Sequence, residues 1–142
     1  MSMRRRIVAS LAALVAFLAA SVGLAGSASA ELASSTATGS QYVVAFTCSS
    51  TLYCDVPDLK LYDTACDGLI AYGQTAYKDA YGARVYLSTH QNTNGCNGGY
   101  AHWSSYISAD GRYGNVIASV GAAAWAGSNS KKWGTFVANP KF

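Results

Sequence analysis

The sequence holds a single glutamate, Glu31, and only two histidines among its 142 residues. Glycoside hydrolysis needs an acid with a raised pKa facing a second carboxylate, and small secreted ribonucleases commonly use a glutamate as base. The Gly-x-Ser-x-Gly elbow of many serine hydrolases is missing as well. His90 and His102 lack an evident catalytic partner in the sequence. Because the sequence lacks the complete set of catalytic residues for each of these enzyme classes, we predict a protein with no catalytic residues and no cofactor.

Most of the chain has no excess of positive charge. Of the ten basic residues, three are Arg4, Arg5 and Arg6, so residues 31–142 hold seven basic and seven acidic side chains. The net charge of +3 therefore belongs to the first thirty residues. Nucleic-acid binding needs a basic excess on one face, so we expect no nucleic-acid partner.

The first thirty residues have the three parts of a secretory signal peptide. A charged start, Arg4–Arg6, precedes the apolar stretch Ile7–Ala20 and the small-x-small end Ala28–Ala30. We predict cleavage between Ala30 and Glu31, and an extracellular mature protein with no membrane attachment. A retained membrane anchor is the alternative, but the apolar stretch is shorter than the roughly 20 residues that a bilayer requires.

The four cysteines all follow this leader. An even number in a short exported chain predicts two disulfides. Zinc is the alternative, but no cysteine pair has the tight spacing of a zinc site, and we predict no metal. Three pairings are possible, and we favour Cys48–Cys54 with Cys66–Cys96, because they close one tight turn and one long loop.

The rest of the composition favours strands, since aromatic residues suit a pleated surface and glycine suits turns. Ala83–Thr89 alternates, with Val85, Leu87 and Thr89 on one face. Ala101–Ile107 also alternates and turns His102 away from the core. The other candidate strands are Gln41–Phe46, Leu59–Tyr62, Leu69–Tyr77, Asn115–Val120 and Gly134–Ala138.

Turn and arm signals complete the fold prediction. Asp110-Gly111 predicts a hairpin between Tyr106 and Asn115, and Ala118–Trp125 is an alternative short helix. Glu31–Ser40 is small, polar and without periodicity, so we predict a flexible N-terminal arm, followed by a domain over 41–142. The fold class is all-β, a small antiparallel β-sandwich or barrel with about six to eight strands.

Residues 31–142 carry sixteen aromatic side chains, more than a core of this size needs. Tyrosine and tryptophan with glycine, serine and asparagine are typical of recognition surfaces, and they also suit sugar stacking. The alternative is that several of the rings fill the core. We predict that surface aromatics contact a partner: Tyr86, Tyr106, Trp125 and Trp133. We also predict contacts from the arm and its following strand: Gln41, Tyr42, Val43, Val44 and Phe46.

One sequence pattern resembles a family of small exported actinobacterial domains of unknown function. It consists of Cys48-x5-Cys54, Cys66-Asp67, Arg84-Val85-Tyr86-Leu87-Ser88, Cys96 and Ala101-His102-Trp103. The resemblance implies a β fold and export, and transfers no activity or site residues. This chain departs from the family in its longer Cys54–Cys66 spacer and in Pro57-Asp58, where the family tends to have Asp-Pro.

In architecture, an arm followed by a disulfide-bonded β domain is similar to the adaptor subunits of secreted Streptomyces antibacterial toxin particles. Such adaptors join two larger subunits, and an extended arm can add to a partner's sheet edge. We therefore predict a secreted, non-enzymatic adaptor that binds larger secreted proteins, with an extracellular antibacterial toxin complex as one such assembly. The alternatives are an inhibitor of an extracellular hydrolase, acting through the loop Asp55–Asp67 or Thr89–Gly99, and a cell-wall or glycan-binding protein.

Overall fold

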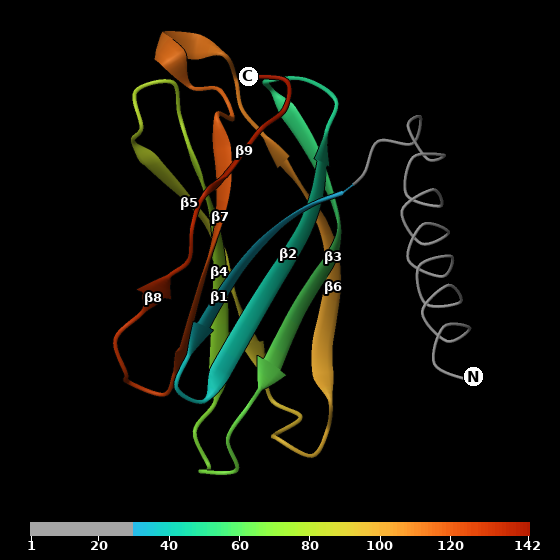
Figure 1. Cartoon of the computed structure of the whole chain (residues 1–142), viewed down its shortest axis with the longest axis vertical. Helices are drawn as coiled ribbons and strands as arrows, with labels where there is room; N and C mark the ends of the chain where they lie inside the picture. The colour runs from blue at the N-terminus through green and yellow to red at the C-terminus, as the bar shows by residue number, and fades with distance from the viewer. Residues whose placement is uncertain (1–29) are drawn as a thin grey trace, which may run out of the picture.

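The computed structural model describes residues 30–142, which form two antiparallel β-sheets packed face to face (Figure 1). The prediction of an all-β fold with two sheets is confirmed. The predicted signal peptide lies outside the described residues, apart from Ala30. Within the described part of the chain, no helix has the length and apolar character needed to cross a membrane.

Sheet A contains four strands in the order β1-β2-β3-β6. They are β1 (Glu31–Ala37), β2 (Ser40–Cys48), β3 (Tyr53–Asp63) and β6 (Tyr100–Ser108). Along β2, buried and half-buried residues alternate without a break. This period of two arises because successive side chains of a strand point to opposite faces, and it directs the larger residues of β2 into the core.

Sheet B has the order β5-β4-β7-β8, with β9 also paired to β7. Its strands are β4 (Ala71–Lys78), β5 (Arg84–Asn92), β7 (Ser119–Ala126), β8 (Lys132–Trp133) and β9 (Val137–Ala138). A short 3-10 turn, η1 (Arg112–Gly114), lies between β6 and β7. The chain thus crosses between the sheets after β3, returns after β5, and crosses again after β6.

The core lies between the sheets and depends on one close approach. Tyr42 of β2 is fully buried, and its ring lies over Gly73 of β4. A Cβ at Gly73 would sit 2.5 Å from the ring carbons, so only glycine leaves room for Tyr42 here. The Tyr42 hydroxyl meets the Thr75 hydroxyl at 3.1 Å, which gives the buried polar tip a hydrogen-bond partner.

The β1 side of the sandwich is closed by backbone contact. Ser35 of β1 donates a hydrogen bond through Oγ to the carbonyl of Lys132 at 2.7 Å. Gly134 lies against the carbonyl of Ser34 so closely that no Cβ fits between them. These contacts join the edge of sheet A to the segment around β8.

The predicted disulfides are confirmed. Cys48 and Cys54 face each other across the β2–β3 pair and are bonded. Cys66, in the loop after β3, is bonded to Cys96, in the loop between β5 and β6. The second bridge therefore ties together two loops at one end of the sandwich.

The prediction of a flexible arm at 31–40 is wrong. Glu31–Ala37 forms β1, which pairs in full register with β2 through a turn at Gly39, where φ is +82°. Ala33 and Ser35 face inward and are buried, and β1 packs against β7. The small residues that suggested disorder are those that fit the narrow space between β1 and the alanine-rich β7.

Two local predictions after β6 are also wrong. Asp110-Gly111 does not close a hairpin, because β6 belongs to sheet A and the next strand, β7, belongs to sheet B. The alternative helix at Ala118–Trp125 is instead β7, whose alanines are buried in the sheet. Of the predicted strands Asn115–Val120 and Gly134–Ala138, only the last two residues of each lie in a strand.

Candidate functional site: an open cleft between two sheet edges

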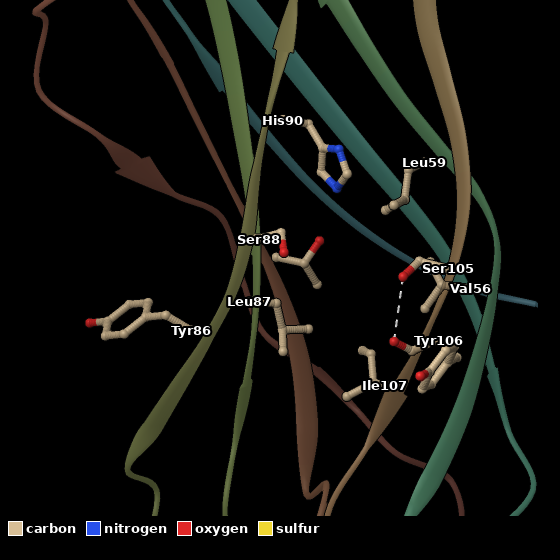
Figure 2. A pocket seen from close by; sticks show the side chains of 10 residues that line it. Val56, Leu59, Tyr86, Leu87, Ser88, His90, Ser105, Tyr106 and Ile107 are labelled. Carbon is tan, nitrogen blue, oxygen red and sulfur yellow. Dashed lines mark hydrogen bonds between the residues drawn. The ribbon is translucent and has the colours of Figure 1, made fainter.

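The side of the sandwich opposite β1 is open. There β5 is the last strand of sheet B and β6 is the last strand of sheet A, and they barely contact each other. A cleft of about 340 Å³ lies between them (Figure 2). The outer backbone edges of β5 and β6 pair with no other strand of the described residues.

The walls of the cleft are mostly apolar. Leu87 of β5 and Ile107 of β6 point into it from opposite sheets, with Val56 and Leu59 of β3 behind them (Figure 2). Leu87 packs against the core yet remains half-buried, because no strand covers it on the open side. The cleft is therefore an uncovered part of the hydrophobic core.

A β-bulge in β5 decides which polar groups enter the cleft. Gln74 pairs with Thr89 and Ala76 pairs with Tyr86, so Leu87 and Ser88 together oppose the single residue Thr75. Such a bulge shifts the alternation by one residue. The sequence prediction that Thr89 shares a face with Leu87 is therefore wrong, and His90 lines the cleft in its place.

His90 is held between aromatic rings. Its ring centroid lies 4.5 Å from that of Trp103 and 6.3 Å from that of Tyr42. Burial lowers the pKa of His90, so the imidazole is neutral at neutral pH. Burial also raises the pKa of Tyr42 to about 12. His90 and Thr75 are thus uncharged polar groups in the cleft lining.

The cleft lining contains no carboxylate that could orient His90. Ser88 and Ser105 line the cleft with His90, but no aspartate or glutamate does. In a catalytic triad, a carboxylate orients the histidine and stabilises its charged form. Elsewhere among residues 30–142, no group of three or more His, Cys, Asp or Glu side chains is placed to hold a metal ion.

The predicted partner contacts in β2 fall into two groups. Tyr42, Val44 and Phe46 are fully buried between the sheets, so the prediction that they contact a partner is wrong for this fold. Gln41 and Val43 are half-buried and lie on the outer face of sheet A, where a partner can reach them. Alternation along β2 separates the two groups, because every second side chain enters the core.

The predicted surface aromatics lie on two surfaces: the ring of Tyr86 is 5.8 Å from that of Trp133, on the outer face of sheet B with Trp125, whereas Tyr106 lies on sheet A. Tyr86 is 58% exposed on β5 and Tyr106 is 62% exposed on β6, and both border the cleft. In Figure 2 the Tyr86 side chain points away from the cavity. Trp125 and Trp133 are half-buried on the outer face of sheet B.

His102 lies on the opposite surface, as the alternation of β6 predicts. Its Nε2 lies 2.8 Å from Asp58 Oδ1, while Lys60 Nζ lies 3.0 Å from Asp58 Oδ2. The two histidines of the chain are therefore in different environments, with His102 beside the half-buried carboxylate of Asp58 and His90 in the cleft.

Sequence reasoning missed the cleft itself. Thr75, Leu87, Ser88 and Ile107 were not singled out, because the sequence contains no signal for which strands end a sheet. The predicted loop Thr89–Gly99, which includes His90, was the one sequence signal near the cleft.

The chain matches no known family model, no curated protein and no solved structure.

Proposed function

We propose that this protein is a secreted, non-catalytic adaptor that takes an extended segment of a larger secreted protein into the cleft between β5 and β6. The observation that carries the proposal is the uncovered core between two free strand edges. An added strand would hydrogen-bond to one free edge and place alternate side chains into the apolar cleft. The same arrangement would satisfy the exposed backbone groups and cover Leu87.

Two further features support a binding role. The cleft combines apolar walls with neutral polar groups at Thr75, Ser88 and His90, which can orient a ligand without a buried charge. Two disulfides indicate an oxidising environment, which is compatible with a secreted protein. An extracellular antibacterial complex is one setting in which such an adaptor would act.

A matched pair of variants tests the cleft. Ser105 lines the cleft, whereas the adjacent Ser104 points to the outer face of sheet A, and both are exposed. Ser105→Arg would place a charged side chain in the path of the added strand, and Ser104→Arg adds the same charge outside it. Each tagged protein would be recovered from the native culture supernatant, and co-purifying proteins identified by mass spectrometry.

The expected result is that the wild type and Ser104→Arg recover the same larger secreted protein in near-equal amounts. Recovery with Ser105→Arg should fall by about tenfold or more, equivalent to the loss of about 1.4 kcal/mol of binding free energy. Equal recovery with both variants would show that the cleft is not the binding site. If the wild type recovers no other protein, the adaptor function is wrong.

Inhibition of an extracellular hydrolase is a second candidate, favoured by one observation. The predicted loops Asp55–Asp67 and Thr89–Gly99 are partly strand, since β3 continues to Asp63 and β5 to Asn92. Their remaining loop residues are linked by Cys66–Cys96, and the nearby Leu69 and Ile70 are about 40% exposed. A rigid, apolar loop tip is suited to inserting into an enzyme's groove. If the recovered partner is a hydrolase, Ile70→Ser should weaken its inhibition, while Ser105→Arg should leave inhibition unchanged.

A further inference from the structure

The outer face of sheet B carries a second surface, separate from the cleft. Its β7 strand presents only small residues near the centre, Gly121 and Ala123, and this lets aromatic rings lie against the sheet. The Phe136 ring covers Gly121, with ring carbons 2.6 Å from the position that a Cβ would occupy. Trp133 pairs with Ala123 across the β7–β8 ladder, and its ring stacks on Phe136 at 5.7 Å.

A second ring pair lies further along the same strands. Tyr72 of β4 and Trp125 of β7 are register partners, and their rings stack at 5.4 Å with planes 13° apart. Trp125 is two residues from Ala123 on β7, a distance of about 7 Å along a strand. The two stacked pairs therefore lie on the same outer face of the sheet, and together they are called the aromatic strip.

Cations lie over both ring pairs. The Arg84 guanidinium is 5.1 Å from the centroid of Trp133 and 5.3 Å from that of Phe136, and Lys78 Nζ is 4.7 Å from Phe136. Lys131 Nζ is 4.5 Å from the centroid of Trp125. Rings attract cations through their negative faces, so the strip fixes the positions of three positive charges.

These cations have no acidic partner. Among residues 30–142, the only ion pairs join Asp58 to Lys60 and to His102, on sheet A. Lys131 Nζ donates to the amide oxygen of Gln74 at 2.6 Å, which orients the charge without neutralising it. Gln74 is itself held by a hydrogen bond from Nε2 to the carbonyl of Leu87.

The acidic residue nearest to these cations in the sequence binds backbone N–H groups instead. Asp79 follows Lys78, but its Oδ1 accepts hydrogen bonds from the backbone N–H groups of Tyr81 and Ala83. Asp55 and Asp58 lie on the outer face of sheet A, in register with β2 and β6. Residues 31–142 thus have equal numbers of acidic and basic side chains, but these side chains are separated in space. The outer face of sheet B carries positive charge that no carboxylate of these residues neutralises.

We propose that this cationic aromatic face, made by Lys78, Arg84, Trp125, Lys131, Trp133 and Phe136, binds an anionic polysaccharide. Carboxylate or phosphate groups of the polymer would lie on Arg84, Lys78 and Lys131, and the C–H faces of its sugar rings on the aromatic strip. The charge complementarity requires an anionic ligand, and the flat strip suits a chain of sugar rings. Three cations, Lys78, Arg84 and Lys131, are few for the closely spaced phosphates of a nucleic acid, whose binding needs a larger basic excess on one face.

This inference is independent of the cleft. An adaptor needs two contacts, and the cleft on the inner side of sheet B with a second surface on its outer side would let one domain hold a protein partner and a polymer together. The binding variants of the two surfaces differ, so failure of one proposal does not imply failure of the other.

The first test compares polymers that differ in one property at a time. The protein purified from culture supernatant would be titrated, by tryptophan fluorescence, with polygalacturonate and with glycosylated poly(ribitol phosphate). Methyl-esterified polygalacturonate has the same sugars without the charge, while poly-L-glutamate and oligo(dT) have charge without this polysaccharide structure. We expect at least one of the two acidic polysaccharides to bind about tenfold or more tightly than all three comparison polymers.

Binding to neither acidic polysaccharide would overturn the proposal. Equal or tighter binding of poly-L-glutamate would assign the face to an acidic protein, and equal or tighter binding of oligo(dT) would assign it to a nucleic acid. Either result would also overturn it.

The second test places the binding on this face. Arg84→Gln and Lys131→Gln should each weaken binding of the acidic polysaccharide by about tenfold, the effect of losing one charge-assisted contact. Arg112→Gln and Lys141→Gln remove the same charge from exposed positions outside the face, and should leave the affinity within about twofold. The cleft variant Ser105→Arg should also bind normally. If the control variants weaken binding as much as Arg84→Gln, the attraction comes from total charge and the proposed site is wrong.

Discussion

Removal of the Cys66–Cys96 disulfide should lower the free energy of unfolding by about 3–4 kcal/mol. The bridge has a sequence separation of 30 residues. The loop-closure relation then gives an entropy change of about 12 cal/mol/K, or about 3.6 kcal/mol at 25 °C. Cys66 is exposed and Cys96 is half-buried, so serines at both positions stay hydrated and add little to this loss.

Removal of the Cys48–Cys54 bridge should cost more stability than removal of Cys66–Cys96, although its shorter loop alone would predict a smaller loss. Its separation of 6 residues corresponds to only about 2 kcal/mol by the same relation. However, Cys48 is 3% exposed and Cys54 is 0% exposed. Serines there would bury two hydroxyls, each of which costs about 1–3 kcal/mol when unsatisfied. We therefore expect Cys48→Ser with Cys54→Ser to lose about 4–8 kcal/mol in total.

The measurement is urea unfolding of the wild type and the two double serine variants, followed by circular dichroism. A domain of this kind has about 5–15 kcal/mol of stability, so the Cys66–Cys96 variant should remain folded. If the Cys48–Cys54 variant does not fold, alanine at both positions avoids the buried hydroxyls and restores a measurable transition. A smaller loss for the Cys48–Cys54 serine variant than for the Cys66–Cys96 variant would refute the argument from burial.

Three other changes test the packing and the cleft. Gly73→Ala should destabilise the domain by about 1–3 kcal/mol through overpacking against Tyr42, and in urea unfolding the double variant with Tyr42→Leu should lose less than the sum of the two single losses. Gly134→Ala should push β1 away from the β8 segment, which hydrogen exchange would detect as faster exchange in residues 31–37; unchanged exchange there would contradict the backbone contact. Because the pKa of His90 is lowered in the fold, the unfolded chain binds more protons below about pH 6.5. Stability should therefore be fully present above that pH and decline as pH falls toward the folded pKa, and unfolding curves of His90→Gln between about pH 7 and pH 5 should show a smaller decline.

Local patterns in the sequence were sufficient for several features of the fold. The alternation in β6 placed Trp103 and Ile107 toward the core and His102 outside, and the structure confirms this. Loop lengths favoured the observed disulfide pairing. These predictions succeeded because side-chain direction in a strand and the closure of a loop depend on residues that are near each other in the chain.

Other features depend on contacts that the local pattern does not contain. Ala33 and Ser35 suggested a flexible arm, but the space beneath β7 accepts small side chains and turns the segment into a strand. The bulge at Leu87 and Ser88 shifts the predicted alternation, because two residues of β5 oppose one of β4. In both places the deciding partner lies on another strand.

By itself, the sequence determined the all-β class, the main alternating strands and the favoured pairing of its cysteines. Only the tertiary structure decided that β5 and β6 would be left as free edges, and that cations and rings from β4, β5, β7 and the C-terminal segment would share one face. The physical reason is that a strand's own periodicity specifies which side chains share its faces, whereas its neighbours in the sheet depend on packing across the whole domain. Both proposed binding surfaces depend on this packing between strands that are distant in the sequence.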